Sequence, residues 1–403
     1  MKKIMLLGGS SQQVIAIETA KRLGYNTVLC DFLPDNPGQY TADKFYLVST
    51  TDREAVLKVA QAERIDGILA YASDPAAPTA AYVAEQMGLP SNSCAAVETL
   101  CNKDRFRRFL AENGFHAPKY EGHSSAGEAV AGAERFRFPF IVKPVDSSGS
   151  KGITVVHQPE EIEGAVSLAF SFSRSHRIII EEYIEKKHPY LIGGDIFIRD
   201  GKIILWGLLN CHRDARVNPL VPAGKSYPPE LEPEDLQTVK DTLQRMVDKL
   251  QIRFGAMNVE LIVDSRGRVW LIDVGPRNGG NMIPDLLGLI FRVDVVEMSV
   301  LAAMEESFCH EIAEGERFYA THNLHSHRNG RFRGMKIHPE LKKKIVHTCI
   351  YKKPGDEVEF FDNAAKALGI VFMRFENGGE MRKHLSVISE EIEILLDETG
   401  VNG

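Results

Sequence analysis

The chain has 403 residues, of which 44% are hydrophobic and 26% charged, so it can bury a large core and divide into two or three lobes. Its formal net charge of -7 argues against a nucleic-acid partner, and no apolar run is long enough to span a membrane. The six cysteines form no CxxC pair and the segment MKKIMLLGGSSQQ lacks a signal-peptide pattern, so we expect a cytoplasmic protein with reduced thiols.

Residues 1–95 alternate short apolar runs with amphipathic segments. Strands are expected at 4–7, 27–30, 45–48 and 67–71, and helices at 14–23, 53–63 and 78–87. This alternation predicts an α/β domain with a doubly wound parallel sheet. A nicotinamide-dependent oxidoreductase would use such a domain, with Asp31 on the ribose. However, the loop at 8–13 reads GGSSQQ and lacks the spaced glycines of the dinucleotide fingerprint.

The pattern changes in the rest of the chain. Residues 96–180 predict a small α+β lobe with a helix at 102–113, ended by Gly114, and a helix at 126–134, begun by a capping box of Ser125 and Glu128. Residues 181–330 predict antiparallel strands and a long helix at 233–250, with Pro233 in its first turn. Residues 331–403 predict a small closing subdomain with strands at 347–351 and 370–375 and a final helix near 389–396.

The segment at 140–155, FIVKPVDSSGSKGITV, places Lys143 at the end of an apolar strand and a Gly/Ser loop directly after it. The lysine can reach phosphate oxygens as a mobile charge, and the loop offers backbone N–H groups with little steric hindrance. The loop residues with this role are Ser147, Ser148, Gly149, Ser150 and Gly152. The pattern predicts a flap over a nucleoside triphosphate, and an ordinary Gly/Ser surface hairpin is the alternative.

Two carboxylates are expected on neighbouring strands of a later hairpin. Glu260 and Asp273 each interrupt an apolar run, and a turn at 265–267 joins the two strands. A charge in such a run is costly unless it is paired or bound to a metal, and carboxylate oxygens suit Mg²⁺. The hairpin therefore predicts a magnesium site, with two acids on a solvated strand face as the alternative.

These motifs occur in an order that resembles the ATP-grasp superfamily, and within it the carboxylate–amine ligases. The resemblance covers nearly the whole chain, through MLLGGSSQQ, DFLPDNPGQYTAD, IDGILAYASDPAAPTAAYVAEQMGLP, NKDRFRRFLAENGFHAP, the Lys143 loop, IIIEEYIE and the Glu260/Asp273 hairpin. It implies an N-terminal pre-ATP-grasp domain at 1–95, a small ATP-grasp lobe at 96–180, a lobe with the metal site at 181–330, and a closing subdomain at 331–403.

The resemblance also implies roles for residues around ATP. Lys103 matches the first nucleotide lysine of the family, at the start of a helix of the small lobe, although an ordinary surface lysine at a helix start is the alternative. Glu181 or Glu182 would lie near the adenine amino group, and the backbone around Tyr183 and Ile184 would pair with the ring edge. The expected cofactors are ATP and Mg²⁺, with Mn²⁺ as a substitute.

The implied reaction joins a small-molecule carboxylate to an amine or another nitrogen nucleophile through an acyl phosphate, releasing ADP and phosphate. Arg277 matches the family arginine that stabilises the oxyanion, unless it is a structural part of its turn. The family also suggests a homodimer. The alternatives are a carboxylation that activates bicarbonate, as in biotin carboxylase, and a non-catalytic protein that binds ATP.

Two departures from the family pattern concern the metal strand and the ribose site. The family pattern Glu-x-Asn-Pro-Arg corresponds to DVGPR at 273–277, with Asp273 in place of the glutamate and Gly275 in place of the asparagine. A second Mg²⁺ is therefore expected to bind weakly or differently. Asn258, Asn278 or Asn281 are candidates to compensate. Leu191 stands where the family commonly has a ribose-binding glutamate.

Acceptor and additional metal residues are less clearly marked in the sequence. Family acceptors lie against the tip of the N-terminal sheet, which makes Gly8, Gly9, Ser10, Ser73 and Asp74 candidates.

Arg213 and Arg216 are candidates for a substrate carboxylate, with loop arginines facing water as the alternative. His325 and His327 would share one face of a strand and are candidates for a metal. Because no acid or cysteine stands at a fitting spacing, alternating histidines that face solvent are the favoured interpretation.

Overall fold

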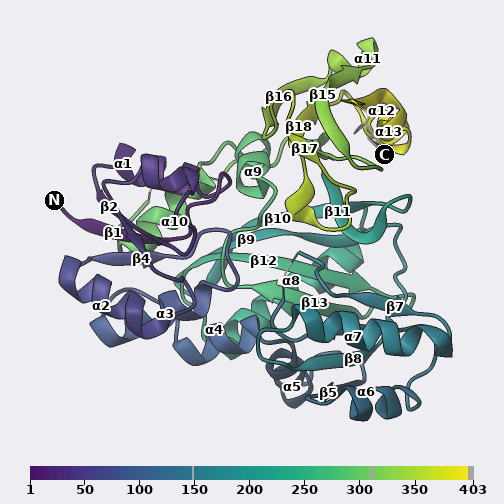
Figure 1. The fold of residues 1–403 in the computed structure, drawn as a ribbon, viewed down its shortest axis with the longest axis horizontal. Coiled ribbons are helices and arrows are strands. Elements are labelled where there is room, and N and C mark those ends of the chain that lie inside the picture. The colour runs from purple at the N-terminus through teal and green to yellow at the C-terminus, as the bar shows by residue number, and fades with distance from the viewer. Residues whose placement is uncertain (148, 309–311, 398–403) are drawn as a thin grey trace, which may run out of the picture.

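The computed structural model describes residues 1–147, 149–308 and 312–397, and the predicted loop residue Ser148 lies outside this part. The described residues build four sheets, with the N-terminal sheet at the left of Figure 1, a small lobe at the lower right and the C-terminal strands at the upper right. None of the helices in these ranges is long and apolar enough to span a membrane.

The N-terminal sheet is parallel, as predicted, with the strand order β3-β2-β1-β4. Its strands are β1 (Lys3–Leu7), β2 (Asn26–Asp31), β3 (Lys44–Leu47) and β4 (Gly67–Leu69). The helices of this region are α1 (Val14–Arg22), η1 (Pro37–Tyr40), α2 (Arg53–Glu63) and α3 (Ala77–Met87). Helix α10 (Val295–Ala303), distant in sequence, joins α1 on this sheet and buries Val296 and Val300 in a cluster with Ile4 and Ile17.

Asp31, the predicted ribose acid of the oxidoreductase alternative, holds the first loop. Its carboxylate accepts hydrogen bonds from the backbone N–H groups of Gly9 at 2.7 Å and Leu33 at 2.8 Å. These bonds fix the turn that follows β1, so the acid serves the local backbone in this domain.

Glu63 at the end of α2 joins three elements of the N-terminal domain. Its buried carboxylate contacts Tyr46 Oη at 2.5 Å, Lys44 Nζ at 2.9 Å and Lys3 Nζ at 3.0 Å. The hydrogen bond from Tyr46, followed by those from Lys44 and Lys3, lowers the pKa of Glu63 to about 2. The ionised form therefore stabilises the fold.

We expect Glu63→Gln to destabilise the protein by about 1 kcal/mol at pH 7, a value reduced by solvent screening of the two lysines. A carboxyl whose pKa is lowered by folding contributes stability above its ordinary pKa, and this stability is lost as the pH falls toward 2. Urea unfolding of wild type and variant should therefore converge as the pH drops below about 4.5. Glu18→Gln, at an exposed position of α1, is the control; a Glu63→Gln difference that did not change with pH would contradict the assignment.

The small lobe contains a four-stranded antiparallel sheet with the order β5-β8-β6-β7. Its strands are β5 (Tyr120–His123), β6 (Phe140–Pro144), β7 (Thr154–Val156) and β8 (Ile178–Glu182). The helices are α4 (Cys94–Cys101), α5 (Lys103–Glu112), α6 (Ala126–Ala133), η2 (Pro159–Glu161) and α7 (Ile162–Phe172). Ser125 precedes α6 as predicted, but its side chain makes no capping hydrogen bond, so the predicted capping box is wrong.

The largest sheet is antiparallel and has eight strands in the order β13-β12-β9-β10-β11-β14-β18-β16. The strands are β9 (Leu191–Arg199), β10 (Lys202–Asp214), β11 (Asn218–Tyr227), β12 (Gly255–Val263), β13 (Val269–Gly275), β14 (Tyr319–Leu324), β16 (Ile345–Ile350) and β18 (Gly369–Arg374). Helix α8 (Pro233–Leu250) begins at the predicted proline and buries Val239, Leu243 and Met246 against this sheet, and α9 (Ile283–Phe291) packs in a second cluster.

The C-terminal residues divide between two sheets. Strands β16 and β18 extend the large sheet, whereas β15 (Gly330–Ile337), β17 (Glu357–Val358) and β19 (Ile392–Asp397) form a separate one. The short helices here are α11 (Pro339–Lys342), η3 (Ala364–Lys366), α12 (Gly378–Ser386) and α13 (Ile388–Glu391). The predicted final helix at 389–396 is therefore wrong: one helical turn leads into β19, because Ile392, Ile394 and Leu396 alternate toward the core. The four-part division by residue number remains a prediction.

Candidate active site

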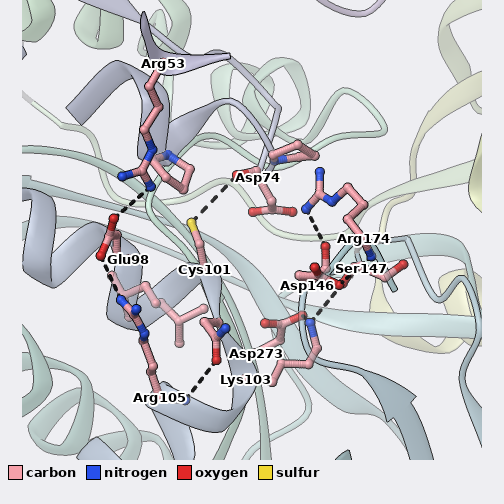
Figure 2. Close-up of a pocket in the computed structure, with 15 residues that line it drawn as sticks. Arg53, Asp74, Glu98, Cys101, Lys103, Arg105, Asp146, Ser147, Arg174 and Asp273 are labelled. Carbon is pink, nitrogen blue, oxygen red and sulfur yellow. Dashed lines mark hydrogen bonds and ion pairs between the residues drawn. The ribbon is translucent and has the colours of Figure 1, made fainter. Parts of the chain in front are cut away.

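A cleft of about 1100 Å³ lies where the N-terminal domain, the small lobe and the large sheet meet; we call it the central cleft. Its lining includes Gln12 and Asp74 from the N-terminal domain, Lys103, Ser147, Gly149 and Ser150 from the small lobe, and Lys225, Asn258, Glu260, Asp273, Gly275 and Arg277 from the large sheet and its extension. An adjacent hollow of about 770 Å³ shares Asp74, Lys103, Ser147 and Asp273 with it. Figure 2 shows this side hollow, whose wall also carries Arg53, Arg105 and Arg174.

Lys143 is buried on β6 and pairs with Glu181 on the neighbouring strand β8. Glu181 is also held by Arg107 of α5, whose Nε lies 2.9 Å from the carboxylate. Burial lowers the pKa of Lys143 to about 8, although Glu181 acts in the opposite direction. Burial tends to raise the pKa of Glu181, but Arg107 and Lys143 outweigh it and lower the value to about 2. The pair is therefore an ammonium and a carboxylate at neutral pH.

Lys103, the first residue of α5, lies between the two lobes. Its Nζ donates to the backbone carbonyl of Ser147 at 2.9 Å and stands 3.4 Å from Asp273 Oδ2, as Figure 2 shows. The residue is only 8% exposed, so the alternative of a free surface lysine is wrong. The start of α5 thus brings a second positive charge to the central cleft.

The predicted flap reaches across the cleft from the small lobe. Ser150 Oγ donates to the backbone carbonyl of Leu220 on β11 at 2.8 Å, and Ser147 and Gly149 line the cavity. Gly152 has φ +72°, and a Cβ there would lie 2.9 Å from Phe172 Cβ. Glycine is therefore required at the base of the loop, where it turns back against α7.

The predicted carboxylates are direct cross-strand partners, with Glu260 of β12 opposite Asp273 of β13. Arg213 Nη2 lies 3.4 Å from Glu260 Oε1, and Lys103 lies at the same distance from Asp273. Burial tends to raise the pKa of Asp273, but the charges of Lys103, Lys143 and Arg107 outweigh it and lower the pKa. Two carboxylates that line one cavity form a donor set that suits Mg²⁺.

Arg277 also lines the central cleft. Its guanidinium pairs with Asp74, which follows β4 in the N-terminal domain. Burial tends to lower the pKa of Arg277, but Asp74 outweighs burial and raises it. The arginine is therefore a fixed cation, and it connects the end of the Glu260/Asp273 hairpin to the N-terminal domain.

Comparison with known proteins identifies one domain of this chain. A family model described as an ATP-grasp domain matches residues 136–285, a range that contains Lys143, Glu181 and the Glu260/Asp273 hairpin. The chain contains an ATP-grasp domain. The cavity at the junction of the two lobes thus belongs to the ATP-grasp domain and to the N-terminal domain that precedes it.

Relatives extend the similarity beyond the ATP-grasp domain. The carbamoyl phosphate synthase large chain of Thermotoga petrophila is 25% identical over 292 residues, which cover 68% of this chain but only 26% of that relative's length. The formate-dependent phosphoribosylglycinamide formyltransferase of Burkholderia pseudomallei is 29% identical over 294 residues, covering 68% of this chain and 69% of the relative. The L-amino acid ligase structure from Bacillus licheniformis matches 99% of both chains with TM-score 0.80 and 19% identity, which shows a shared fold.

Gly275, which stands where the sequence resemblance implies an asparagine, lies in a sterically crowded position. A Cβ at this position would lie 2.4 Å from Asp74 Oδ1 and 2.9 Å from Arg277 Cζ. Any larger side chain would therefore push apart the Asp74–Arg277 pair. The glycine makes room for a contact between the ATP-grasp domain and the N-terminal domain.

We expect Gly275→Ala to lower the turnover of ATP by about 10- to 100-fold, because a small displacement of a positioned charge is costly to catalysis. The Kd for ATP should stay within about twofold, since the altered pair joins the N-terminal domain to the end of the Glu260/Asp273 hairpin and includes no residue of the flap. Steady-state ADP release and ATP titration measure the two quantities. Gly164→Ala, at a position with open space in α7, is the control; equal turnover in both variants would argue against the steric role.

The residues of the predicted adenine strand do not line either cavity, and neither does Lys143, whereas Lys103, Ser147, Gly149 and Ser150 do. Glu181 is buried beneath Lys143, whereas Glu182 is exposed at the end of β8, where its carboxylate accepts from Lys119 N at 3.2 Å. Tyr183 is 37% exposed and Ile184 is buried. These four residues do not line the central cleft or the side hollow, so their role toward adenine remains a prediction.

The candidate asparagines differ in their surroundings. Asn258 lines the central cleft, where its Nδ2 donates to Asp195 at 2.8 Å, and Asn281 lies on the cleft wall with its backbone N–H bound to Gln12 at 2.9 Å. Asn278 is buried away from the cleft, and its Oδ1 accepts from Ser299 at 2.9 Å. Leu191 is the first residue of β9, outside the two cavities, so the ribose contact stays unassigned.

Two buried charged residues near the central cleft, Arg107 and Asp195, are among those that were not predicted from the sequence. Arg107 holds Glu181 and donates to the carbonyl of Ile272 at 2.7 Å, which links α5 to the metal strand. Asp195 is fully buried on β9, where burial raises its pKa to about 6 and its oxygens accept from Gly279 N at 2.8 and 2.9 Å. Asp195 interrupts an apolar run, which by itself names no partner, and Arg107 stands among other charged residues of its helix, where no signal distinguishes it.

Proposed function

We propose that this protein is an ATP-dependent ligase that activates a small carboxylate as an acyl phosphate and transfers the acyl group to a nitrogen nucleophile. The observation that carries the proposal is the meeting of Lys103, Glu260 and Asp273 in one cavity that the flap residues and Arg277 also line. Positive charges on one lobe and paired acids on the other suit a metal-bound triphosphate.

ATP would bind with its phosphates between the lobes. Lys143 and Lys103 would neutralise phosphate oxygens, and the N–H groups of the flap would donate to them. Glu260 and Asp273 would hold Mg²⁺, which, when bound, supplies positive charge to the phosphate oxygens. In the absence of the metal each acid is balanced by a cation, Arg213 or Lys103, which keeps the two carboxylates together.

The first step would be attack of the substrate carboxylate oxygen on the γ-phosphorus. The bond from that phosphorus to the β-phosphate oxygen breaks, and ADP leaves. In the second step an amine nitrogen attacks the acyl carbon, the bond to phosphate breaks, and the nitrogen gives up a proton. Arg277 is the catalytic residue we assign to the developing oxyanion, because it is a fixed cation at the cleft wall with donors in a rigid fork.

The substrates we propose are small molecules that enter beside the N-terminal domain. Gln12 and Asp74 line the same cavity as Arg277, so an amine can meet a carboxylate side chain there. Arg213 can hold a substrate carboxylate when Mg²⁺ occupies Glu260, whereas Arg216 is already bound to Asp214. We further propose a cytoplasmic homodimer, in keeping with the sequence resemblance.

ADP release in the presence of Mg-ATP tests the proposal. Purified protein is assayed against amino acids and small carboxylates, bicarbonate included, each with and without an amine acceptor. We expect one carboxylate to stimulate ADP release and the matching amine to accelerate it, with an amide product detected by mass spectrometry. Stimulation by bicarbonate alone would instead support carboxylation. Tight ATP binding without stimulated release by any acid would overturn the ligase proposal in favour of a binding protein.

A further inference from the structure

A group of polar side chains lies apart from the carboxylate pair, at the end of β10. Asp214 is the last residue of that strand, and His325 and His327 follow β14. Asp214 Oδ2 lies 3.2 Å from His325 Nε2 and 3.0 Å from His327 Nε2. One ligand atom from each of the three residues falls within 4.8 Å of the others. We call this group the Asp214–His325–His327 cluster.

The hydrogen bonds of His325 determine which nitrogen faces the carboxylate with a lone pair. Its Nδ1 lies 2.6 Å from the backbone carbonyl oxygen of Asn323, which can only accept, so Nδ1 carries the proton. In the neutral ring, Nε2 then directs a lone pair at Asp214 Oδ2, and two lone-pair atoms at this distance repel each other. A cation is therefore required, either a second proton on the ring or a metal ion.

The ring orientation favours the metal. Histidines that bind metals almost always donate the other ring N–H to a carbonyl or carboxylate, which fixes the tautomer and aims the free nitrogen at the ion. His325 is fixed in this way, and its ring also stacks on Phe361 at 4.5 Å with an angle of 23°. Tetrahedral Zn²⁺ with bonds of ~2.0–2.1 Å separates its ligand atoms by about 3.3 Å. The distances of 3.0 and 3.2 Å in the cluster are close to this value.

The surroundings orient the carboxylate and leave room for a further ligand. Arg216 binds both oxygens of Asp214 at 3.1 Å. A hollow of about 670 Å³, lined by both histidines and Ser389, adjoins the cluster. His327 is 40% exposed at its side chain and opens the site to solvent.

We propose that Asp214, His325 and His327 bind a Zn²⁺ ion, with a fourth position open to water or a small ligand. Two imidazoles and one carboxylate are ligands that zinc takes, whereas Mg²⁺ prefers an all-oxygen set such as the carboxylates of the central cleft. The neighbouring residue Arg213 contacts Glu260, so the ion would also anchor the strand end that reaches the central cleft. This site goes beyond the proposed ligase function and does not depend on it.

Metal binding to the whole protein tests the proposal without any activity assay. The protein is stripped with a chelator, dialysed, and titrated with Zn²⁺ in competition with a chromophoric chelator, with excess Mg²⁺ present. We expect one Zn²⁺ per chain that Mg²⁺ does not displace, and the visible absorption of a tetrahedral site when Co²⁺ replaces Zn²⁺. His327→Gln and Asp214→Asn should each weaken the affinity by at least about 100-fold, since each removes a direct ligand.

His157→Gln, which alters an exposed histidine outside the cluster, should bind Zn²⁺ as the wild type does. If Asp214→Asn fails to fold, His327→Gln decides the question, because that side chain is partly exposed and its loss leaves the core unchanged. Less than one equivalent of bound Zn²⁺ in the wild type would overturn the proposal. Unchanged affinity in His327→Gln would overturn it as well, and so would a doubly protonated His325 ring in the Zn²⁺-treated protein.

Discussion

Replacing Lys143 with methionine is expected to lower ATP turnover by about 100- to 1000-fold, because one fixed donor to the developing charge is lost. Methionine keeps the apolar stem that packs in the small lobe, and Glu181 retains Arg107 as a partner. The fold should therefore survive, and the effect should appear in both kcat and the Kd for ATP. ADP release and direct ATP titration measure these two quantities.

The control for this variant is Lys151→Met, which removes an exposed lysine from the same loop. It should retain nearly all of the wild-type turnover. The pH profile adds a second readout: because burial lowers the pKa of Lys143 to about 8, the charged form declines above that pH. We expect kcat/KM for ATP to fall above about pH 8 in the wild type and to show no such fall in Lys143→Met. A fall above pH 8 that persisted in the variant would show that another group causes it.

Replacing Arg107 with methionine is expected to give a large loss of stability, about 3 kcal/mol. The guanidinium is fully buried and binds Glu181 together with the carbonyl oxygens of Leu271 and Ile272. Its removal leaves those carbonyls without this donor and Glu181 with one cation in place of two. Urea unfolding at neutral pH, followed by circular dichroism, measures the change.

Arg108→Met is the matched control, because this neighbouring arginine of α5 is exposed. Its stability should stay within about 0.5 kcal/mol of the wild type, as expected for a surface position. The Arg107 variant should also bind ATP more weakly, since α5 carries Lys103 into the central cleft. Equal unfolding midpoints for the two variants would contradict a role for Arg107 in holding the lobes together.

Local patterns predicted the elements of the fold well where a helix or strand buries one continuous face. The parallel sheet of β1 to β4 was predicted from the alternation of apolar strands with amphipathic helices. The start of α8 at Pro233 was predicted because proline is favoured in the first turn of a helix. The end of the chain was predicted wrongly, because residues 389–396 carry apolar side chains at spacings that suit both a helix and a strand. Pairing of β19 with β15 decided between the two.

The candidate site could be predicted only in part for a similar reason. Lys143 precedes its loop directly, and Glu260 and Asp273 are joined by a short turn, so their proximity is a local property. Arg107 and Glu181 are separated by 74 positions in the chain, and Asp74 and Arg277 by 203, so no spacing rule brings them together. The contact that explains Gly275 is visible only when the N-terminal domain packs against the hairpin.

The histidine pair shows the same difference between contacts that local sequence predicts and contacts that only the fold creates. The sequence predicted that His325 and His327 lie near each other, and in the absence of a nearby acid it favoured rings that face solvent. In the structure His325 is buried and both rings meet Asp214, 111 and 113 positions away. By itself, the sequence determined the elements, the nucleotide loop and the acid pair, because these depend on neighbours along the chain. Only the tertiary structure decided which buried charges meet, because a buried ion needs a partner and the fold supplies it from distant strands.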